Sequence, residues 1–209
     1  LRYNFSILIS RFFIFFPIKE NRILFIAYGG NQFSCNPKYL YKYISKNHTR
    51  YECIWAFSSP ELLADFKEKE KPAVKILSLR FFYLICTSKF IIDNNHFMSG
   101  YPARKEQVYI QTWHGGGAYK KVGVSAFMKD QYKLIKKAKK IDYYVASCEK
   151  FIEVQSLSNF IEPNKFIKTG MPRNSFILNG DETIIDNVYK YLKINRDVKL
   201  VLYAPTYRG

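Results

Sequence analysis

Apolar runs of strand length alternate with segments of helical character along almost the whole of this 209-residue chain. The runs lack the polar alternation of a half-exposed strand, which is typical of strands buried on both faces of a parallel sheet. The alternation therefore predicts an α/β fold, in which a parallel sheet carries helices on both faces. We expect strands at residues 22–28, 51–57, 74–77, 89–93, 107–112, 141–146 and 166–169, and helices at residues 36–46, 61–70, 80–87, 126–140, 149–156 and 179–193.

Polar or glycine-rich turns follow four of the expected strands, at Gly29-Gly30, Asn94-Asn95, His114-Gly115 and Gly170. The carboxyl ends of parallel strands meet at one edge of a sheet, where open α/β folds bind their ligands. We therefore expect these turns to line one common site, although glycine-rich turns at this edge are also ordinary in α/β folds. At the start of the helix expected from residue 36, Asn36 before Pro37 is the pattern of a helix cap.

The turn after residues 107–112 has the sequence Gln111-Thr-Trp-His-Gly-Gly-Gly-Ala-Tyr-Lys-Lys-Val-Gly123. Its glycines let a ligand approach backbone amides that can bind phosphate oxygens, and Lys120 and Lys121 add positive charge. His114 is a candidate general base, because imidazole exchanges protons near neutral pH. The turn matches neither the GxxxxGK[ST] nor the GxGxxG pattern. Taken alone, it indicates either chemistry on a phosphorylated substrate or a glycine-rich turn in which His114 caps the next helix.

The segment QTWHGGGAYKKVG resembles the QTWHGTPLKKxG signature of the CDP-glycerol glycerophosphotransferases, which build teichoic acids and related capsular polymers. Further segments between residues 22 and 209 resemble motifs of the same family in the same order: NPKYL at 36–40, TGMPRN at 169–174 and VLYAPTYR at 201–208. The chain departs from the family at Gly116-Gly117, where Thr-Pro is usual, and at Ser175 and Gly209, where Asp is common. The first departure bears on which polyol the site accepts.

The resemblance implies the Rossmann-like N-terminal domain of a GT-B type transferase with a truncated second domain. On this basis residues 21–178 are an acceptor-side domain, preceded at residues 1–20 by a segment whose composition makes it a candidate membrane-interfacial segment. Residues 179–209 are a linker helix followed by the first strand, at residues 199–204, of a C-terminal nucleotide-binding domain. The family carries most nucleotide contacts and a further catalytic histidine on that second domain, so we expect this chain alone to fold but to be inactive.

The activity that the resemblance implies is transfer of glycerol phosphate from CDP-glycerol to a hydroxyl of a membrane-linked teichoic-acid-like or capsular polymer, with release of CMP. His114 would be the general base of this reaction, which needs no metal or other cofactor. A ribitol-phosphate transferase, or a GT-B sugar transferase with another nucleotide donor, is the nearest alternative. Expected substrate-binding residues are Gly115, Gly116, Gly117, Ala118, Arg173, Pro205, Thr206 and Arg208, and candidate acceptor-side residues are Gly29, Gly30, Asn94, Asn95, Lys120 and Lys121.

The chain is strongly basic, with 33 Lys and Arg residues against 17 Asp and Glu residues and a formal net charge of +16. This excess favours anionic partners such as an acidic lipid surface, nucleic acid or a polyanionic polymer. No RRM, KH or helix-turn-helix signature is present, so a non-enzymatic basic module that binds nucleic acid or membrane is the distant alternative. One face of the expected helix 126–140 is either a solvated face or a basic surface for lipid or polyphosphate; it carries Lys129, Lys133, Lys136 and Lys140.

Residues 1–17 are rich in Phe and Ile, but they are interrupted by Arg11 and are too short to cross a bilayer, which takes about 20 apolar residues. We expect this segment to lie in a membrane interface or to form a first core helix. In the first case the protein is peripheral on the cytoplasmic face of the membrane. The 4 cysteines lack CxxC spacing, which is typical of free thiols in a reducing compartment and indicates no metal site.

Overall fold

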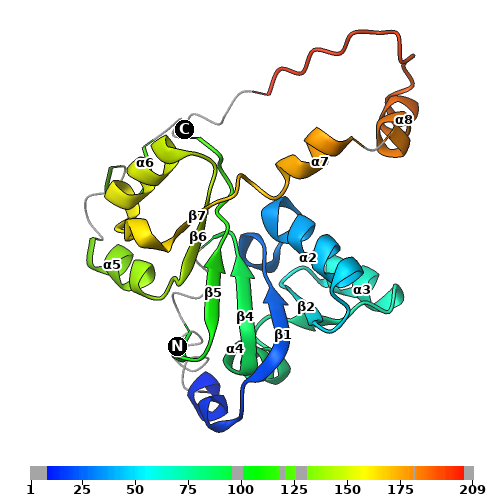
Figure 1. Ribbon diagram of the computed structural model, residues 1–209. Helices are drawn as coiled ribbons and strands as arrows, with labels where there is room; N and C mark the ends of the chain where they lie inside the picture. The colour runs from blue at the N-terminus through cyan, green and yellow to red at the C-terminus, as the bar shows by residue number, and fades with distance from the viewer. Residues whose placement is uncertain (1–8, 96–100, 118–120, 126–130, 181, 205–209) are drawn as a thin grey trace. The chain divides into compact units, whose positions relative to one another are not determined.

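Seven strands form one parallel sheet in the order β3-β2-β1-β4-β5-β6-β7, in a computed structural model that describes residues 9–95, 101–117, 121–125, 131–180 and 182–204 (Figure 1). The predicted parallel α/β fold is thereby confirmed. The strands are β1 (Lys19–Phe25), β2 (Glu52–Phe57), β3 (Ala73–Lys75), β4 (Ser88–Asp93), β5 (Val108–Gln111), β6 (Tyr143–Ala146) and β7 (Phe166–Lys168). The helices are α2 (Cys35–Asn47), α3 (Pro60–Glu68), α4 (Leu79–Thr87), α5 (Gln131–Lys139), α6 (Glu149–Asn159), α7 (Asn174–Asn179) and α8 (Glu182–Leu192), with short 3-10 helices η1 (Phe13–Phe15), η2 (Tyr28–Gly30), η4 (Gly123–Ser125) and η6 (Pro163–Lys165).

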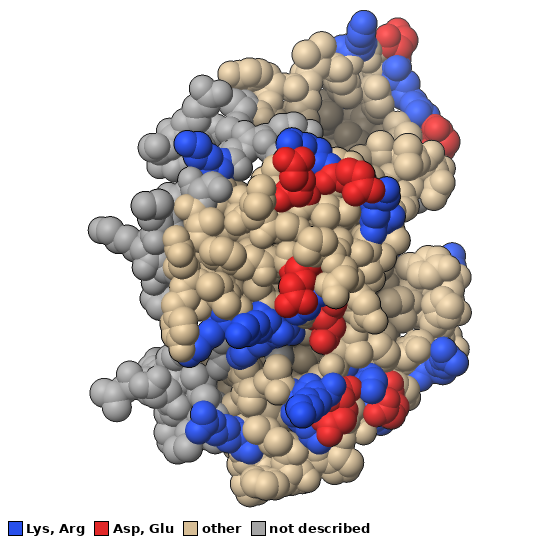
Figure 2. Space-filling view, turned by 60° about the vertical axis from the view of Figure 1, so that its left-hand side comes forward, with Lys and Arg blue, Asp and Glu red and all other residues tan. Residues whose placement is uncertain are grey.

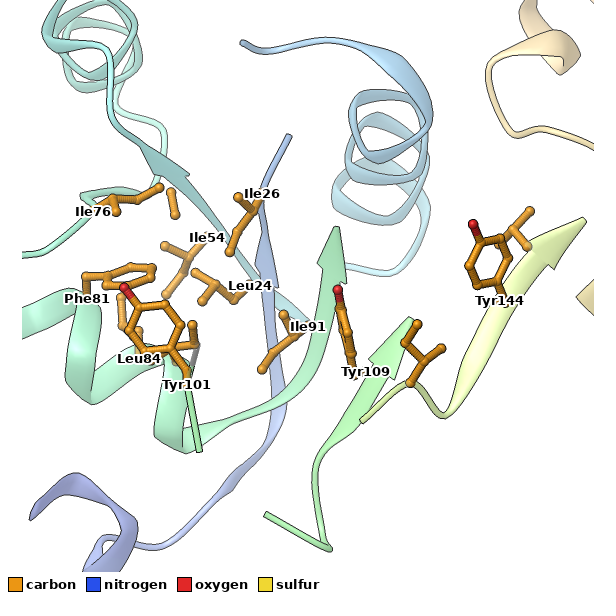
Figure 3. Close-up of a cluster of buried hydrophobic side chains, with 14 of the residues drawn as sticks. Leu24, Ile26, Ile54, Ile76, Phe81, Leu84, Ile91, Tyr101, Tyr109 and Tyr144 are labelled. Atoms are coloured by element: carbon orange, nitrogen blue, oxygen red, sulfur yellow. The ribbon is translucent and has the colours of Figure 1, made fainter. Parts of the chain in front are cut away.

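The strands direct alternate side chains into two apolar cores, one on each face of the sheet. In β1, Leu24 packs into the core to which α4, α5 and α6 contribute (Figure 3), whereas Phe25 packs into the core to which α2 and α3 contribute. Both side chains are fully buried. Burial on both faces explains why the central part of each inner strand is a continuous apolar run, and it confirms the prediction of helices on both faces.

The order of the strands reverses between β1 and β4. From β1 the chain builds β2 and β3 outward on one side, and it then returns to place β4 and the later strands on the other side. The loops that leave β1 and β4 therefore diverge at the carboxyl edge of the sheet, which is the switch point where open α/β sheets bind ligands. Tyr28 and Asn94 follow these two strands.

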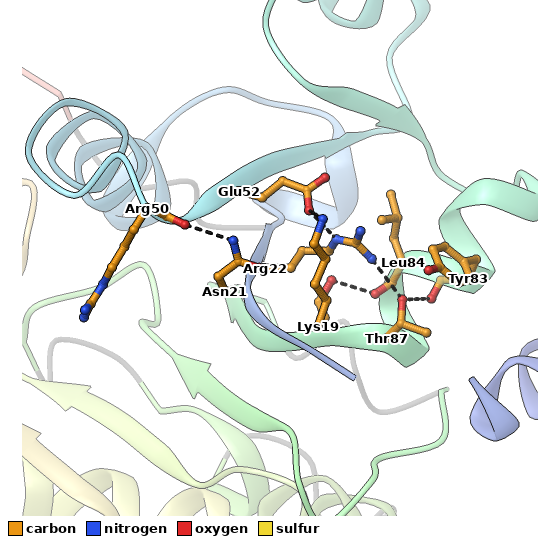
Figure 4. Close-up of polar contacts among 9 residues, drawn as sticks. Lys19, Asn21, Arg22, Arg50, Glu52, Tyr83, Leu84 and Thr87 are labelled. Carbon is orange, nitrogen blue, oxygen red and sulfur yellow. Dashed lines mark hydrogen bonds and ion pairs between the residues drawn. The ribbon is translucent and has the colours of Figure 1, made fainter. Parts of the chain in front are cut away.

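A buried arginine links neighbouring strands at a distance from that edge (Figure 4). Arg22 donates from Nε to Glu52 Oε2 (2.9 Å) and from Nη1 to Thr87 Oγ1 (3.2 Å), and Lys19 Nζ lies 3.0 Å from the same Glu52 oxygen. Burial raises the pKa of the Glu52 carboxyl, but the hydrogen bonds from Arg22 and Lys19 outweigh it and hold the pKa below its usual value. The Arg22 guanidinium is therefore occupied by the fold and is not a candidate ligand-binding group.

Helix α2 begins differently from the prediction. Its N-cap is Ser34, whose side chain makes no capping hydrogen bond, and Asn36 and Pro37 lie buried inside the first turn. The predicted capping role of Asn36 is therefore wrong, because its side-chain amide is used in contacts with distant loops. Helix α3 begins as expected, since Ser59 accepts a hydrogen bond from the Leu62 amide at 3.3 Å.

The chain divides into two compact units, residues 1–174 and 175–209. In the second unit, Arg196 holds the segment after α8 against that helix by donating to Glu182 Oε2 (2.8 Å) and Asp186 Oδ1 (2.7 Å). The helix predicted at residues 179–193 is α8, and the short α7 before it was not predicted.

The strand predicted at residues 199–204 is not formed. Residues 201–203 are exposed by 87–89%, and no described residue pairs with them. An extended segment becomes a strand only when a neighbouring strand supplies its ladder hydrogen bonds. Local sequence indicates that this segment can be extended, but its pairing is a tertiary property.

The N-terminal segment packs on α4 with one side and exposes aromatic rings on the other. Phe13 contacts Tyr83 edge-on, with ring centroids 5.9 Å apart, and Cys86 Sγ lies 3.2 Å from the Ser10 carbonyl oxygen. Phe12 and Phe15 are 63% and 88% exposed. The segment therefore has features of both predicted alternatives, a core contact and an exposed aromatic surface. Among the described residues, no helix combines the length and apolar character needed to cross a bilayer.

Fewer lysines than predicted are exposed on the described part of α5 and at the residue that follows it. Lys136 is exposed, but Lys140 is half-buried and its Nζ donates to the Tyr101 carbonyl oxygen at 2.6 Å. Burial lowers the pKa of Lys140. The side chains of Lys129 and Lys133 lie outside the described residues. Figure 2 shows Lys and Arg side chains standing beside Asp and Glu side chains on one face, so the excess charge does not form a uniformly basic surface there.

All four cysteines lie within the described residues and are free thiols, as the spacing predicts. Cys53 and Cys86 are buried, and burial raises the pKa of each thiol to about 11. These two thiols are inert core groups, because the protonated form is a weak nucleophile.

Candidate functional site

Four loops meet at the carboxyl edge of the sheet, around the switch point between β1 and β4. They follow β1, β4, β5 and β7, and the start of α2 joins them; all lie within the first compact unit. Hydrogen bonds between loops that are far apart in sequence hold the group together. The predicted convergence of turns at one edge is thus seen in the fold (Figure 1).

Asn36 is the residue that connects most of these loops. Its side chain is fully buried, and Nδ2 donates to the carbonyl oxygens of Thr112 (3.0 Å) and Trp113 (3.1 Å) in the loop after β5. Its Oδ1 accepts from the backbone amide of Arg173 (3.3 Å) in the loop after β7. One side chain at the start of α2 thereby fixes two loops that lie 76 and 137 residues further along the chain.

Arg173 lies against the histidine loop. Its Nη1 donates to the His114 carbonyl oxygen at 2.9 Å and lies 3.3 Å from Cys35 Sγ. The guanidinium is half-buried, with further donors that these two contacts do not use. A phosphate oxygen is the kind of acceptor that such a planar donor group binds best.

His114 lies half-buried between two aromatic rings. Its ring packs edge-on against Trp113, with centroids 4.3 Å apart, and against Tyr28, with centroids 5.7 Å apart. Trp113 has a positive φ of 52°, an unusual backbone conformation for a bulky residue. The backbone turns sharply at Trp113, directly before the histidine, and strain of this kind is often held in place at functional sites.

A chain of buried polar groups supports this turn from below. Asp93 Oδ2 accepts from the Tyr109 hydroxyl at 2.8 Å, and that hydroxyl accepts from Gln111 Nε2 at 3.1 Å. Gln111 Oε1 then accepts from the Trp113 amide at 2.8 Å. Because these side chains are buried, each needs its hydrogen-bond partner. This hydrogen-bond network holds the turn at Trp113 in one conformation.

Tyr28 contributes a phenol that stays protonated. Burial, together with a hydrogen bond and charge interaction with the Cys35 thiol, raises the pKa of Tyr28 to about 12, although the positive charge of Arg173 opposes this. At neutral pH the hydroxyl beside His114 is therefore a neutral hydrogen-bonding group. Its own backbone has a positive φ of 47°, and its amide donates to Asn94 Oδ1 at 2.9 Å across the switch point.

The acceptor-side candidates differ in what surrounds them. Asn94 is fully buried, and its Nδ2 has no hydrogen-bond partner among the described residues. Gly30 is buried, with a positive φ of 86°, and an added Cβ would lie 2.6 Å from the Ser58 amide nitrogen. Gly29 is half-buried in open surroundings, whereas Asn95 and Lys121 are exposed. Gly30 therefore shapes the turn, and Asn94 has a buried Nδ2 donor without a partner among the described residues.

The predicted substrate-binding residues fall into two groups. Gly115, Gly116 and Gly117 lie half-buried in the loop beside Arg173, and Ser147 Oγ after β6 donates to the Gly116 carbonyl. The others lie outside the described residues: Ala118, Pro205, Thr206 and Arg208, as does the acceptor-side candidate Lys120. No cluster of His, Cys, Asp and Glu that could hold a metal occurs among the residues that the structure describes.

Tyr28, Cys35 and Asn36 also belong to this site, although the sequence did not predict them as site residues. The signal for Asn36 was present, since it begins the NPKYL segment, but a helix cap explained it locally. Nothing in the local sequence points to Tyr28 or Cys35, because their contacts with His114 and Arg173 exist only in the folded chain.

Comparison with known proteins gives a consistent result. The sequence model of the CDP-glycerol:poly(glycerophosphate) glycerophosphotransferases matches residues 8–209. The teichoic acid poly(glycerol phosphate) polymerase of Bacillus subtilis (strain 168) is 31% identical over 202 residues, which is 92% of this chain and 27% of that protein. The corresponding polymerase of Bacillus spizizenii is 31% identical over 203 residues, 92% of this chain and 51% of that protein. The chain thus spans between about a quarter and a half of the length of these relatives.

Among solved structures, the wall teichoic acid polymerase TagF with CDPG resembles this chain with a TM-score of 0.82 at 23% identity. The match covers 97% of this chain and 53% of that one. This likeness confirms the predicted Rossmann-like, GT-B type fold.

Proposed function

Because this chain belongs to the CDP-glycerol:poly(glycerophosphate) glycerophosphotransferase family, we propose that the protein transfers glycerol phosphate from CDP-glycerol to a hydroxyl of a lipid-linked teichoic-acid-like or capsular polymer. The observation that carries the proposal is the placement of His114, Arg173 and the glycine loop together at the switch point of the sheet. This is the edge where open α/β sheets bind ligands, and a base beside phosphate-binding groups suits phosphoryl chemistry.

In the proposed reaction the acceptor hydroxyl attacks the phosphorus that carries glycerol. His114 takes the hydroxyl proton as the new oxygen–phosphorus bond forms, and the bond to CMP breaks so that CMP leaves with its electron pair. The amides of Gly115–Gly117 and the free donors of Arg173 hold the phosphate oxygens. Positioning and charge, with no covalent intermediate or cofactor, supply most of the rate.

The proposed division of labour follows the family resemblance. Residues 21–178 form the acceptor-side domain, and residues 179–209 lead into a nucleotide-binding domain, to which Pro205, Thr206 and Arg208 contribute. In this proposal the 209 residues alone fold but do not transfer glycerol phosphate.

The full-length protein tests the activity directly. It is incubated with acceptor membranes and, in parallel, with labelled CDP-glycerol, CDP-ribitol and UDP-glucose. We expect label from CDP-glycerol to enter polymer with one CMP released per unit, and at least about 100-fold slower transfer from the other two, because a site that hydrogen-bonds a polyol discriminates strongly. Faster transfer from CDP-ribitol or UDP-glucose would replace this proposal with the corresponding alternative.

We further propose that the protein is peripheral on the cytoplasmic face of the membrane, with the segment 1–20 at the lipid surface. Phe12 and Phe15 are exposed beside Arg11, which is the combination that binds an interface between headgroups and acyl chains. The net charge of +16 adds attraction to acidic lipid. No nucleic-acid partner is proposed.

Vesicle binding tests the membrane proposal. The full-length protein should sediment with acidic vesicles and dissociate as salt rises, because exposed charges are screened. Replacing Phe12 and Phe15 together by Ser should weaken binding by about 10-fold or more, since each buried Phe contributes about 1.5–3 kcal/mol. The matched control is Leu157→Ser on α6, which is 70% exposed and should have no effect. Equal binding of both variants would show that the aromatic segment does not contact lipid.

A further inference from the structure

The geometry around Asn36 points to a role that local sequence does not suggest. We infer that Asn36 is a positioning residue for the reaction: it holds the backbone that carries His114 in register with the loop that carries Arg173. The inference rests on the proposed function for its kinetic part, and on the structure alone for its mechanical part.

The Asn36 side-chain amide does not cap its own helix. It lies inside the first turn of α2, and the N-cap position is occupied by Ser34. Both ends of the side chain are instead directed to other loops. The two Nδ2 hydrogens have the Thr112 and Trp113 carbonyls as strong acceptors, with Met171 Sδ as a weak third contact at 3.5 Å.

These hydrogen bonds lead directly to the two candidate functional residues, His114 and Arg173. Trp113 precedes His114, and the Arg173 amide that donates to Asn36 Oδ1 belongs to the residue whose guanidinium binds the His114 carbonyl. Asn36, the 112–114 backbone and Arg173 therefore form a closed ring of hydrogen bonds. A change at any one member shifts the others.

Asn36 itself cannot contact a ligand. Its side chain is fully buried and all its strong hydrogen-bonding groups are used. Any effect on turnover must therefore pass through the groups that it holds. A displacement of about 1 Å at a catalytic group can lower a rate by about 100-fold.

Hydrogen exchange tests the mechanical part and does not depend on any activity. In the full-length protein, Asn36→Ala should raise exchange of the backbone amides in residues 112–117 by about 10-fold or more and leave those of β2 unchanged. The matched control is Asn47→Ala at the other end of α2, an exposed amide that donates to the Tyr43 carbonyl of its own helix at 2.9 Å. Unchanged exchange in residues 112–117 would overturn the inference, whatever the enzyme transfers.

Kinetics test whether the effect passes through His114. Asn36→Ala should lower kcat by about 10- to 100-fold, with a change in KM for CDP-glycerol below about 3-fold. In a His114→Ala background the same substitution should cost less than about 2-fold, because residues that act as a unit are not additive. A full additional loss in that background would make Asn36 a structural residue only.

Two outcomes keep the tests separate. If Asn36→Ala does not fold, Asn36→Ser retains one hydroxyl donor for the carbonyls and is expected to give intermediate exchange and intermediate kcat; wild-type values for both would overturn the inference. If the wild-type enzyme transfers nothing from CDP-glycerol, the proposed function fails, while the exchange result still decides whether Asn36 holds the histidine loop.

Discussion

Replacing His114 by Ala in the full-length protein is expected to lower turnover with CDP-glycerol by about 100- to 10,000-fold while the protein remains folded. General acid–base groups contribute rate factors of this size. His114 lies half-buried at the carboxyl edge of the sheet, with its carbonyl bound to Arg173 and its ring between Trp113 and Tyr28. The measurement is the initial rate of CMP release, with circular dichroism as the check on folding.

The control for this prediction is another histidine of the same domain. His48 is the C-cap of α2, is exposed and packs its ring against Tyr43 of the same helix, so His48→Ala should leave turnover within about 2-fold of wild type. Near wild-type transfer by a well-folded His114→Ala protein would remove His114 from the mechanism and shift attention to a base on another part of the enzyme.

Replacing Gly30 by Ala is expected to lower the free energy of unfolding by about 2–5 kcal/mol. Its φ of 86° costs a side chain about 1–2 kcal/mol, and overpacking adds about 1–3 kcal/mol. The new Cβ would lie 2.6 Å from the Ser58 amide nitrogen, which donates to the Gly30 carbonyl at 2.8 Å and cannot move freely. Thermal or urea denaturation measures the loss.

The neighbouring glycine provides a matched control. Gly29 has a similar positive φ of 65°, but the nearest atom to an added Cβ is Asn31 Nδ2 at 3.9 Å. Gly29→Ala should therefore cost only the backbone term of about 1–2 kcal/mol. Equal losses of unfolding free energy for the two variants would mean that crowding at Gly30 contributes nothing. Both glycines would then be needed only for their positive φ.

The parallel sheet could be predicted from the sequence, because burial on both faces leaves a strong local mark. A strand such as β2 must be apolar on both sides, and the helices between strands must be long enough to cross back over the sheet. The same argument places the loops at one edge. The histidine loop could also be predicted, since its residue order resembles a family motif.

The strand predicted at residues 199–204 is not formed among the described residues, for a physical reason. Its apolar residues favour an extended backbone, yet a strand exists only through hydrogen bonds to a neighbour, and no described residue supplies them. The lysine face of α5 was altered in a similar way, because Lys140 turns to the carbonyl of Tyr101, 39 residues earlier.

Local sequence patterns were sufficient to predict the fold class, the position of the candidate base and the family. Tertiary structure alone decided which side chains surround that base. Asn36 reads locally as a cap, and only the packing of α2 against the loops after β5 and β7 turns its amide toward the histidine backbone. Hydrogen-bond partners separated by more than 70 residues leave no periodic trace in a sequence, because their pairing depends on how the chain closes the sheet and not on local backbone preference.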